Sequence, residues 1–429
     1  MSMHIYFSGI GGTAIGPLAM IAAQAGYSVS GSDKQDSQYI HYLRAHGIND
    51  IHIGQSYDQI ADLHKKSSID WYVYSSAVTI ENPEAPELKF CDDHKIKTSK
   101  RDELLNKIIT DKKLKLVAIA GTHGKTTTTA MAVWLMKRLN IPISYAVGAK
   151  ISYGEMGQYT PGSEYFIYEA DEFDRNFLAF QPYMSLITGI AYDHQEIFPT
   201  LGDYQAAFRQ FLNASEHKVV WNSDVKLVNL ATDNTYQVLE DNEPMLSRIK
   251  LVGAVNRRNA WQVINAVHKL LNVPLDDLIN HVNHFPGLSR RFERITENLY
   301  SDYAHTPEKI KGCLQTAFEV SQNVIVVYEP LTDRRQHYIK DTYKDLFIGV
   351  KKLYWVPSYL AREDPSQPVL SPTDLISHMD NKDVAEPAAL NDSLALKVQG
   401  HITSGDLVVC ITGGGGGSLD EWIRQQFEK

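Results

Sequence analysis

The chain contains 429 residues, of which 43% are hydrophobic and 10% are aromatic. A single core stops growing at about 250 to 300 residues, so this length predicts two or three domains. The 42 Lys and Arg against 51 Asp and Glu give a net charge of −9, and no long basic run offsets it. Because nucleic-acid binding depends on concentrated positive charge, the composition argues against a nucleic-acid partner.

The cysteines and the apolar segments exclude two further classes. Cys91, Cys313 and Cys410 are far apart and odd in number, so they form neither a disulfide framework nor a C-x-x-C metal site. No segment approaches the ~20 apolar residues of a membrane span, and no signal-peptide pattern precedes the apolar strand at residues 5–7. We expect a cytoplasmic protein without a membrane partner, and the sequence leaves both a monomer and a homodimer open.

Three regions each begin with a β-strand pattern and then alternate helix and strand patterns. This order is typical of α/β units with largely parallel sheets. A charged stretch at residues 111–113 and the turn-forming pair Pro286-Gly287 separate the regions. We therefore predict an α/β protein with three domains, at residues 1–107, 108–286 and 287–429.

The first predicted strand leads into the glycine-rich segment Gly9-Ile10-Gly11-Gly12-Thr13-Ala14, and Asp33 follows the second strand at residues 27–30. This pattern is a dinucleotide-binding fingerprint in which Ala14 replaces the third glycine. Its glycines allow the backbone to approach a diphosphate closely. The pattern by itself also fits an NAD-dependent oxidoreductase.

A second glycine loop lies between the apolar strand at residues 116–120 and a helical pattern. It consists of Gly121, Thr122, His123, Gly124, Lys125, Thr126 and Thr127. Strand, glycine loop and helix are the context of a phosphate-binding loop, in which Lys125 neutralises the β- and γ-phosphates and Thr126 binds Mg²⁺. Ile119 stands where the strict spacing requires the first glycine. The alternative, an ordinary strand-to-helix turn, leaves the Gly-Lys-Thr-Thr run unexplained.

An acidic segment, Glu169 to Asp174, follows the apolar run at residues 165–168, and Tyr192-Asp193-His194 comes later. Carboxylates at the carboxyl edge of a strand suit a hard cation such as Mg²⁺. Taken separately, an acidic loop is usually a solvated surface and a lone histidine is usually structural. Together with a phosphate loop about 45 residues upstream they favour a metal site, because ATP chemistry requires a metal ion.

The phosphate loop and the acidic motif, in this order, resemble those of the Mur ligase family. The resemblance implies that Glu169 and His194 hold the magnesium that bridges the γ-phosphate and the substrate carboxylate. Thr188-Gly189 departs from the family's usual Thr-Asn. Phe208 and Arg209 occupy the neighbourhood in which some members carry a carbamylated lysine.

The segment Gly253 to Asn259 is similar to the family's G-x-H-N-x-x-N pattern, with Val255 in place of the histidine. The resemblance implies that Asn256 contacts adenine, since an amide both donates and accepts hydrogen bonds. The alternative role of Asn256 is a helix N-cap.

The third region adds two segments that resemble family signatures, Arg290 to Glu293 and Ser301 to Pro307. An arginine pair is usually solvated, but the resemblance implies that Arg291 reaches the nucleotide phosphates. It further implies that Asp302 and His305 orient the incoming amine or the reacting carboxylate. By the same resemblance, Arg334 and Arg335 bind the amino acid.

The resemblance covers nearly the whole chain and implies Rossmann-like first and third domains around a P-loop ATPase-like central domain. The first domain would bind the UDP-sugar through Gly9, Gly11, Gly12, Thr13, Asp33, Ser75 and Ser76. The expected reaction uses ATP and Mg²⁺ to activate the lactyl carboxylate of UDP-N-acetylmuramate as an acyl phosphate and join it to L-alanine. The recycling reaction, in which a tripeptide is the amine, stays open. A nucleotide-binding regulator with a decayed site is disfavoured, because the residues that carry the chemistry are retained.

Overall fold

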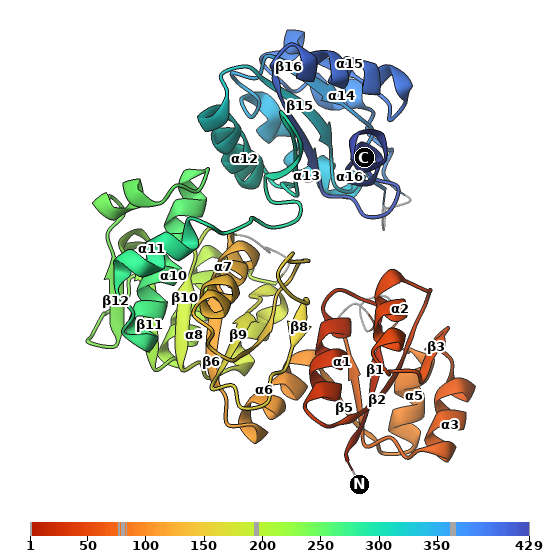
Figure 1. Cartoon of the computed structure of the whole chain (residues 1–429). Coiled ribbons are helices and arrows are strands. Elements are labelled where there is room, and N and C mark those ends of the chain that lie inside the picture. The colour runs from red at the N-terminus through yellow and green to blue at the C-terminus, as the bar shows by residue number, and fades with distance from the viewer. Residues whose placement is uncertain are drawn as a thin grey trace. The chain divides into compact units, whose positions relative to one another are not determined.

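The computed structural model describes residues 2–75, 78, 82, 84–192, 197–360 and 366–428. It contains three sheets in which parallel strand pairs dominate, with helices on the faces of each (Figure 1). The predicted α/β fold is therefore confirmed. None of the helices in the described part of the chain combines the length and apolar character of a membrane-spanning segment.

The first sheet is fully parallel, with the strand order β3-β2-β1-β4-β5. Its strands are β1 (His4–Ser8), β2 (Ser28–Asp33), β3 (Ile51–Ile53), β4 (Trp71–Tyr74) and β5 (Lys97–Lys100). Its helices are α1 (Ile15–Gln24), α2 (Gln38–Ala45), α3 (Tyr57–Lys66), α5 (Pro86–Asp93) and α6 (Arg101–Asp111). The strand order reverses between β1 and β4, and ligands of such sheets bind where it reverses. The first glycine loop follows β1 at this point.

The second sheet has the order β12-β11-β10-β6-β9-β7-β8, with only the edge strand β8 antiparallel to its neighbour. Its strands are β6 (Lys115–Ala120), β7 (Ile143–Ala146), β8 (Gly157–Gln158), β9 (Tyr165–Glu169), β10 (Met184–Ile187), β11 (His217–Trp221) and β12 (Tyr236–Leu239). The α-helices are α7 (Lys125–Arg138), α8 (Leu201–Asn213), α9 (Asn222–Leu227), α10 (Ala254–Leu271) and α11 (Leu275–Val282), and two 3-10 helices are η1 (Phe173–Ala179) and η2 (Pro244–Arg248). Strand β6 lies between β9 and β10, so the loops that follow these three strands meet at one edge.

The third sheet has the order β13-β14-β18-β15-β16-β17, with β13 paired antiparallel to β14. Its strands are β13 (Glu293–Thr296), β14 (Leu299–Asp302), β15 (Val324–Glu329), β16 (Lys352–Trp355), β17 (Ala385–Pro387) and β18 (Leu407–Thr412). The α-helices are α12 (Pro307–Val320), α13 (Asp333–Ile339), α14 (Pro372–Ile376), α15 (Asp392–Thr403) and α16 (Leu419–Phe427), and two 3-10 helices are η3 (Lys340–Lys344) and η4 (Lys382–Val384).

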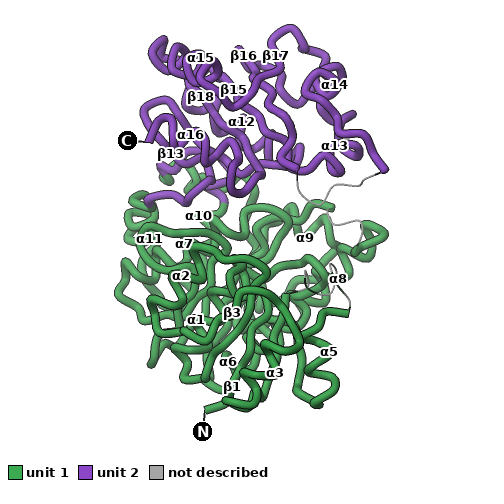
Figure 2. Tube along the Cα trace, turned by 90° about the vertical axis from the view of Figure 1, so that its right-hand side faces the viewer, with its two compact units in different colours: residues 1–249, 259–285 green, residues 250–258, 286–429 purple. Residues whose placement is uncertain are grey.

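The chain divides into two compact units, coloured separately in Figure 2. The first unit, residues 1–249 and 259–285, holds the first two sheets, and the second unit holds the third. Helix α6 explains why two sheets share one unit. Its apolar residues Leu104, Leu105 and Ile108 are buried in the same core as Phe166 and Phe177, and each such side chain stabilises the fold by about 1.5–3 kcal/mol. The boundaries at residues 107 and 286 remain predictions.

Candidate active site

The second glycine loop turns sharply from β6 into α7 and requires its glycines. Gly121 and Gly124 have φ angles of +137° and +81°, which favour glycine. A Cβ on Gly121 would lie 2.4 Å from Thr188 Oγ1 and 2.9 Å from the Gly189 carbonyl oxygen. Thr122 N donates to that carbonyl at 2.8 Å. The unusual Thr188-Gly189 pair therefore packs directly against the loop.

Lys125, the first residue of α7, is held by the loop and by the acidic motif. Its Nζ donates to the Gly121 carbonyl oxygen at 2.7 Å and to Glu172 Oε2 at 2.5 Å. The lysine side chain is 14% exposed and the glutamate 1%. Burial by itself lowers the pKa of Lys125, but the nearby charges of Glu172, Asp171 and Glu169 outweigh it and raise the pKa above its ordinary value. Lys125 is therefore a charged, positioned cation.

The other carboxylates of the acidic motif also have specific partners. Arg101 Nη2 donates to Asp171 Oδ2 at 3.4 Å, and Lys100 pairs with Asp174. Glu169 is different, because its Oε1 accepts from the Thr126 hydroxyl at 2.9 Å and its Oε2 from Gly148 N at 3.1 Å. Among the described residues, it is the one acid of the motif whose hydrogen-bond donors are all neutral. Glu169 is thus the carboxylate of the motif that is best placed to bind a cation.

The structure brings two of the three predicted magnesium ligands together. A hydroxyl and a carboxylate oxygen, here from Thr126 and Glu169, are the donor types that Mg²⁺ prefers. The third predicted ligand, His194, lies outside the described residues, as does Asp193. In the described part of the chain, no group of three or more His, Cys, Asp or Glu residues is arranged for a metal ion. These two donors fit the predicted Mg²⁺ site, and the complete ligand set remains a prediction.

The first glycine loop gathers most of the predicted UDP-sugar residues. Gly9 has a φ of +79°, and Gly11 N donates to Asp33 Oδ2 at 2.8 Å. A Cβ on Gly11 would lie 2.7 Å from Ser37 Oγ, and one on Gly9 would lie 3.9 Å from Ser75 Oγ. Asp33 therefore braces the loop in this structure. Gly12 forms the next turn of the loop, and Ser76 lies outside the described residues.

A cavity of about 170 Å³ lies between the first glycine loop and Glu169 within the first unit. Thr13 and Ala14, at the start of α1, line it together with Gly148, Glu169 and Arg101. Arg101 is not among the residues predicted from the sequence, because no motif marks it. Its position directly after β5, at the carboxyl edge of the sheet, was the one available signal.

The start of α10 separates the roles of two asparagines. Asn259 is 1% exposed, and its side-chain amide lies 2.9 Å from where a Cβ on Gly124 would stand. It packs against the phosphate loop, a contact that the sequence analysis did not assign. Asn256 instead lies in the first turn of α10, where its Nδ2 donates to the Val252 carbonyl oxygen at 2.8 Å. The N-cap alternative for Asn256 is wrong, because the helix already begins at Ala254.

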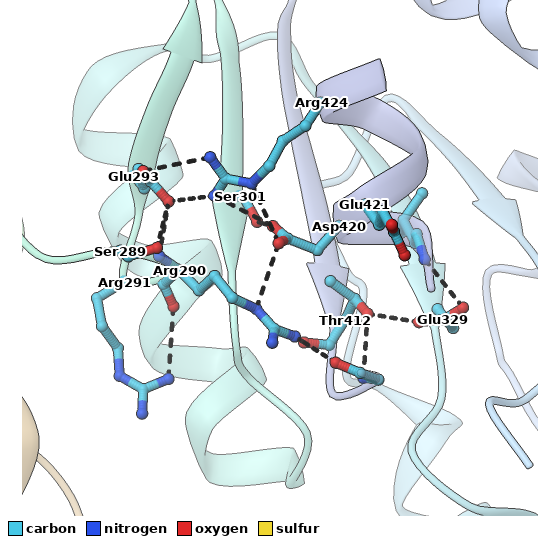
Figure 3. Close-up of polar contacts among 12 residues, drawn as sticks. Ser289, Arg290, Arg291, Glu293, Ser301, Glu329, Thr412, Asp420, Glu421 and Arg424 are labelled. Atoms are coloured by element: carbon cyan, nitrogen blue, oxygen red, sulfur yellow. Dashed lines mark hydrogen bonds and ion pairs between the residues drawn. The ribbon is translucent and has the colours of Figure 1, made fainter. Parts of the chain in front are cut away.

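In the second unit the two arginines of the Arg290-Arg291 pair behave differently (Figure 3). Arg290 donates to the carbonyl oxygens of Gly414 at 2.7 Å and Thr412 at 3.3 Å, and its Nε lies 3.7 Å from Asp420 Oδ2. It thereby fixes the glycine run that follows β18. The Arg291 side chain runs in another direction, with its guanidinium 5.0 Å from the centre of the Tyr303 ring and its Nη1 donating to the Arg290 carbonyl oxygen at 3.4 Å. Arg291 is thus the member of the pair available to a ligand.

Asp302 and His305 are half-buried, and both feel the charge of Arg291. Burial raises the pKa of Asp302 above its ordinary value, although the charge of Arg291 opposes this, and its Oδ2 accepts from Phe292 N at 2.7 Å. Burial, reinforced by Lys309, lowers the pKa of His305 to about 3. His305 Nδ1 donates to the Tyr303 carbonyl oxygen at 2.9 Å. At neutral pH the imidazole is therefore uncharged, which suits an orienting role and not proton abstraction.

The two arginines predicted to bind an amino acid are both on α13. Arg335 is partly buried and contributes to lowering the pKa of His305, so it lies in the same electrostatic environment as Arg291. Arg334 is exposed. The geometry therefore favours Arg335 over Arg334 as part of a common site with His305.

Comparison with known proteins decides the family. The profile "Mur ligase family, catalytic domain" matches residues 4–113, and "Mur ligase middle domain" matches residues 119–244. A UDP-N-acetylmuramate–L-alanine ligase of Clostridium perfringens is 31% identical over 399 residues, which cover 85% of each chain. The chain belongs to the Mur ligase family. It is an acid–amino-acid ligase of peptidoglycan synthesis, and its family uses ATP.

Other relatives cover even more of this Mur ligase. The enzyme of the same name from Clostridium novyi is 29% identical over 446 residues, covering 96% of this chain and 94% of its own. A UDP-N-acetylmuramate–alanine ligase from Thermotoga maritima has a TM-score of 0.75 at 23% identity, with 99% and 98% of the two chains covered. A murein peptide ligase from Psychrobacter arcticus has a TM-score of 0.67 at 18% identity, covering 100% and 99%. These two structures show the shared fold. Because the first glycine loop lies within a matched family segment, the oxidoreductase alternative is set aside.

Proposed function

We propose that this Mur ligase joins L-alanine to the lactyl carboxylate of UDP-N-acetylmuramate in an ATP-dependent reaction. The observation that carries the proposal is the cavity that links the first glycine loop to Glu169, which is hydrogen-bonded to Thr126 of the phosphate loop. A sugar nucleotide bound at the first loop could place its acid there. The relatives named for this reaction support the choice of substrates.

The reaction has two balanced steps. A carboxylate oxygen attacks the γ-phosphorus of ATP, the bond to the β–γ bridging oxygen breaks, and ADP leaves with the electron pair. The neutral amine then attacks the carbonyl carbon of the acyl phosphate, phosphate leaves, and the new amide nitrogen loses a proton. Phosphorylation is required because a free carboxylate is a poor electrophile and would only take a proton from the amine.

The residues of the central site would assist by position and charge. Lys125 would exchange Glu172 for the β- and γ-phosphates and offset the repulsion between two anions. Asn256 and the loop from Gly121 to Thr127 would hold the nucleotide. Thr126, Glu169 and His194 would hold Mg²⁺, which supplies further neutralisation of the phosphate charge when bound.

Residues of the other two predicted domains would deliver the substrates. In the domain at residues 1–107, the glycine loop, Asp33, Ser75 and Ser76 would bind the UDP-sugar. In the domain at residues 287–429, Arg291 would bind the phosphates of ATP. Asp302 and neutral His305 would orient the amine, and Arg335 with Arg334 would bind its carboxylate.

A second candidate amine is the tripeptide of cell-wall recycling, favoured by the structural likeness to a murein peptide ligase over the whole chain. The two are separated by measuring phosphate release from ATP and UDP-N-acetylmuramate with L-alanine, glycine, L-serine and the tripeptide offered separately. The proposal expects stimulation by L-alanine above the others. Stimulation by the tripeptide alone would replace it with the second candidate, and stimulation by none would overturn both.

A further inference from the structure

The acidic motif beside the phosphate loop poses an electrostatic problem for an acidic substrate. Glu169, Asp171 and Glu172 lie within four residues of one another, and any carboxylate that approaches a nucleotide here meets them. Lys125 offsets Glu172, but it is held in the phosphate loop. A second cation is needed on the side from which the acid enters.

Arg101 has the position for this role. It lines the cavity with Thr13 and Glu169, and among the described residues that line this cavity it is the one Lys or Arg. Its side chain is 22% exposed, with Nε 3.6 Å from Asp102 Oδ1 and Nη2 3.4 Å from Asp171 Oδ2. These two carboxylates hold the guanidinium without close, bidentate contact.

The guanidinium of Arg101 also has unused donors. A guanidinium carries five N–H groups in a rigid fork that matches a carboxylate. Within the described part of the chain, Arg101 makes one hydrogen bond, the 3.4 Å contact to Asp171. A half-satisfied arginine in a cavity wall is costly unless water or a ligand completes its hydrogen bonds.

We infer that Arg101 binds the carboxylate of the sugar-linked acid and guides it past the acidic motif to the phosphate loop. The inference rests on the proposed function and adds a residue that distinguishes an acid from a neutral sugar. We expect Arg101 to bind the carboxylate and not the diphosphate, because Arg101 lines the same cavity as Glu169 and pairs with Asp171, two residues further along the acidic motif. The diphosphate has its own glycine loop at the start of α1.

The test compares two nucleotide sugars by calorimetry in the absence of ATP. UDP-N-acetylglucosamine is UDP-N-acetylmuramate without the lactyl group. The dissociation constant of UDP-N-acetylglucosamine divided by that of UDP-N-acetylmuramate therefore measures how much the carboxylate contributes to binding. We expect Arg101→Met to lower this ratio by about tenfold or more, the value of a hydrogen bond between charged groups. Arg101→Lys should restore part of it. Equal weakening for both sugars would assign Arg101 to the diphosphate, and an unchanged ratio would remove it from the site.

Two further variants separate binding from folding. Arg101→Met with Asp171→Asn removes a cation and an anion together, so it should fold with its charge balance kept and still lose the preference for the acid. Lys100→Met is the matched control, because Lys100 pairs with Asp174 but does not line the cavity, and its ratio should stay at the wild-type value. If the wild-type protein binds neither sugar, the proposed function itself fails. If the wild type and Arg101→Met have the same affinity for each of the two sugars, only this inference fails.

Discussion

Replacement of Lys125 by alanine tests the central site most directly, because the structure gives this residue two separable roles. Lys125→Ala removes the cation that lies 2.5 Å from Glu172, whose side chain is 1% exposed. Removing one partner of a buried ion pair destabilises a protein by about 3–5 kcal/mol. In a domain of the size predicted at residues 108–286, such a loss corresponds to a fall of about 6–20 °C in the melting temperature. ATP-dependent phosphate release should be abolished, while UDP-sugar binding should be largely retained.

The double variant Lys125→Ala with Glu172→Gln is the control. It should recover most of the stability, because no buried charge loses its counter-ion, yet it should remain inactive. Burial raises the pKa of Glu172, so its ionised form is the one that the fold disfavours. The stability deficit of Lys125→Ala should therefore shrink between pH 8 and pH 5. Thermal unfolding followed by calorimetry measures each quantity, and a single variant as stable as wild type at pH 8 would refute the argument.

Three further predictions concern other parts of the site. Gly121→Ala should abolish ATP binding, since its Cβ would lie 2.4 Å from Thr188 Oγ1, whereas Gly202→Ala, with its closest atom at 3.6 Å, should bind ATP normally in a filter assay. Glu169→Gln should lower turnover by about 10²-fold or more and weaken its dependence on added Mg²⁺, with the affinity for UDP-N-acetylglucosamine, which lacks the acid, unchanged by calorimetry. The pKa of His305 is lowered to about 3, below that of the unfolded chain, so its protonation destabilises the second unit as the pH falls below about 6.5. His305→Gln should flatten this loss in urea unfolding between pH 7 and pH 4, and an unaltered pH dependence would contradict the assignment.

Local sequence patterns predicted the elements whose chemistry is also local. The loop from Gly121 to Thr127 could be predicted because strand, glycines and helix follow one another within a few residues, and the structure places them as expected. Arg101 and Asn259 could not be predicted in the same way. Each reaches the site through a contact with a segment distant in sequence: Arg101 with Asp171, and Asn259 with Gly124.

The same distinction applies to the Arg290-Arg291 pair. The family resemblance predicted that Arg291 is the member of the pair that reaches the nucleotide, although the two side chains are chemically identical. Only the contacts of Arg290 with the glycine run and Asp420 show that this residue is committed to the fold. The family pattern therefore selected Arg291, and the tertiary contacts of Arg290 give a physical reason for that choice.

The Lys125–Glu172 pair also links nucleotide binding to cation binding. When Lys125 turns to the phosphates of ATP, Glu172 loses the cation beside it just as up to four negative charges arrive. Glu169, which the structure surrounds with neutral donors, is the carboxylate that can hold a compensating cation. ATP and Mg²⁺ should therefore bind with positive coupling, and each should raise the affinity for the other by the same factor. Glu172→Gln removes one of the repelling charges, so ATP affinity measured in EDTA should rise while the affinity for MgATP changes less. Equal affinities of the wild type for ATP with and without the metal would show that Lys125 alone balances the charge.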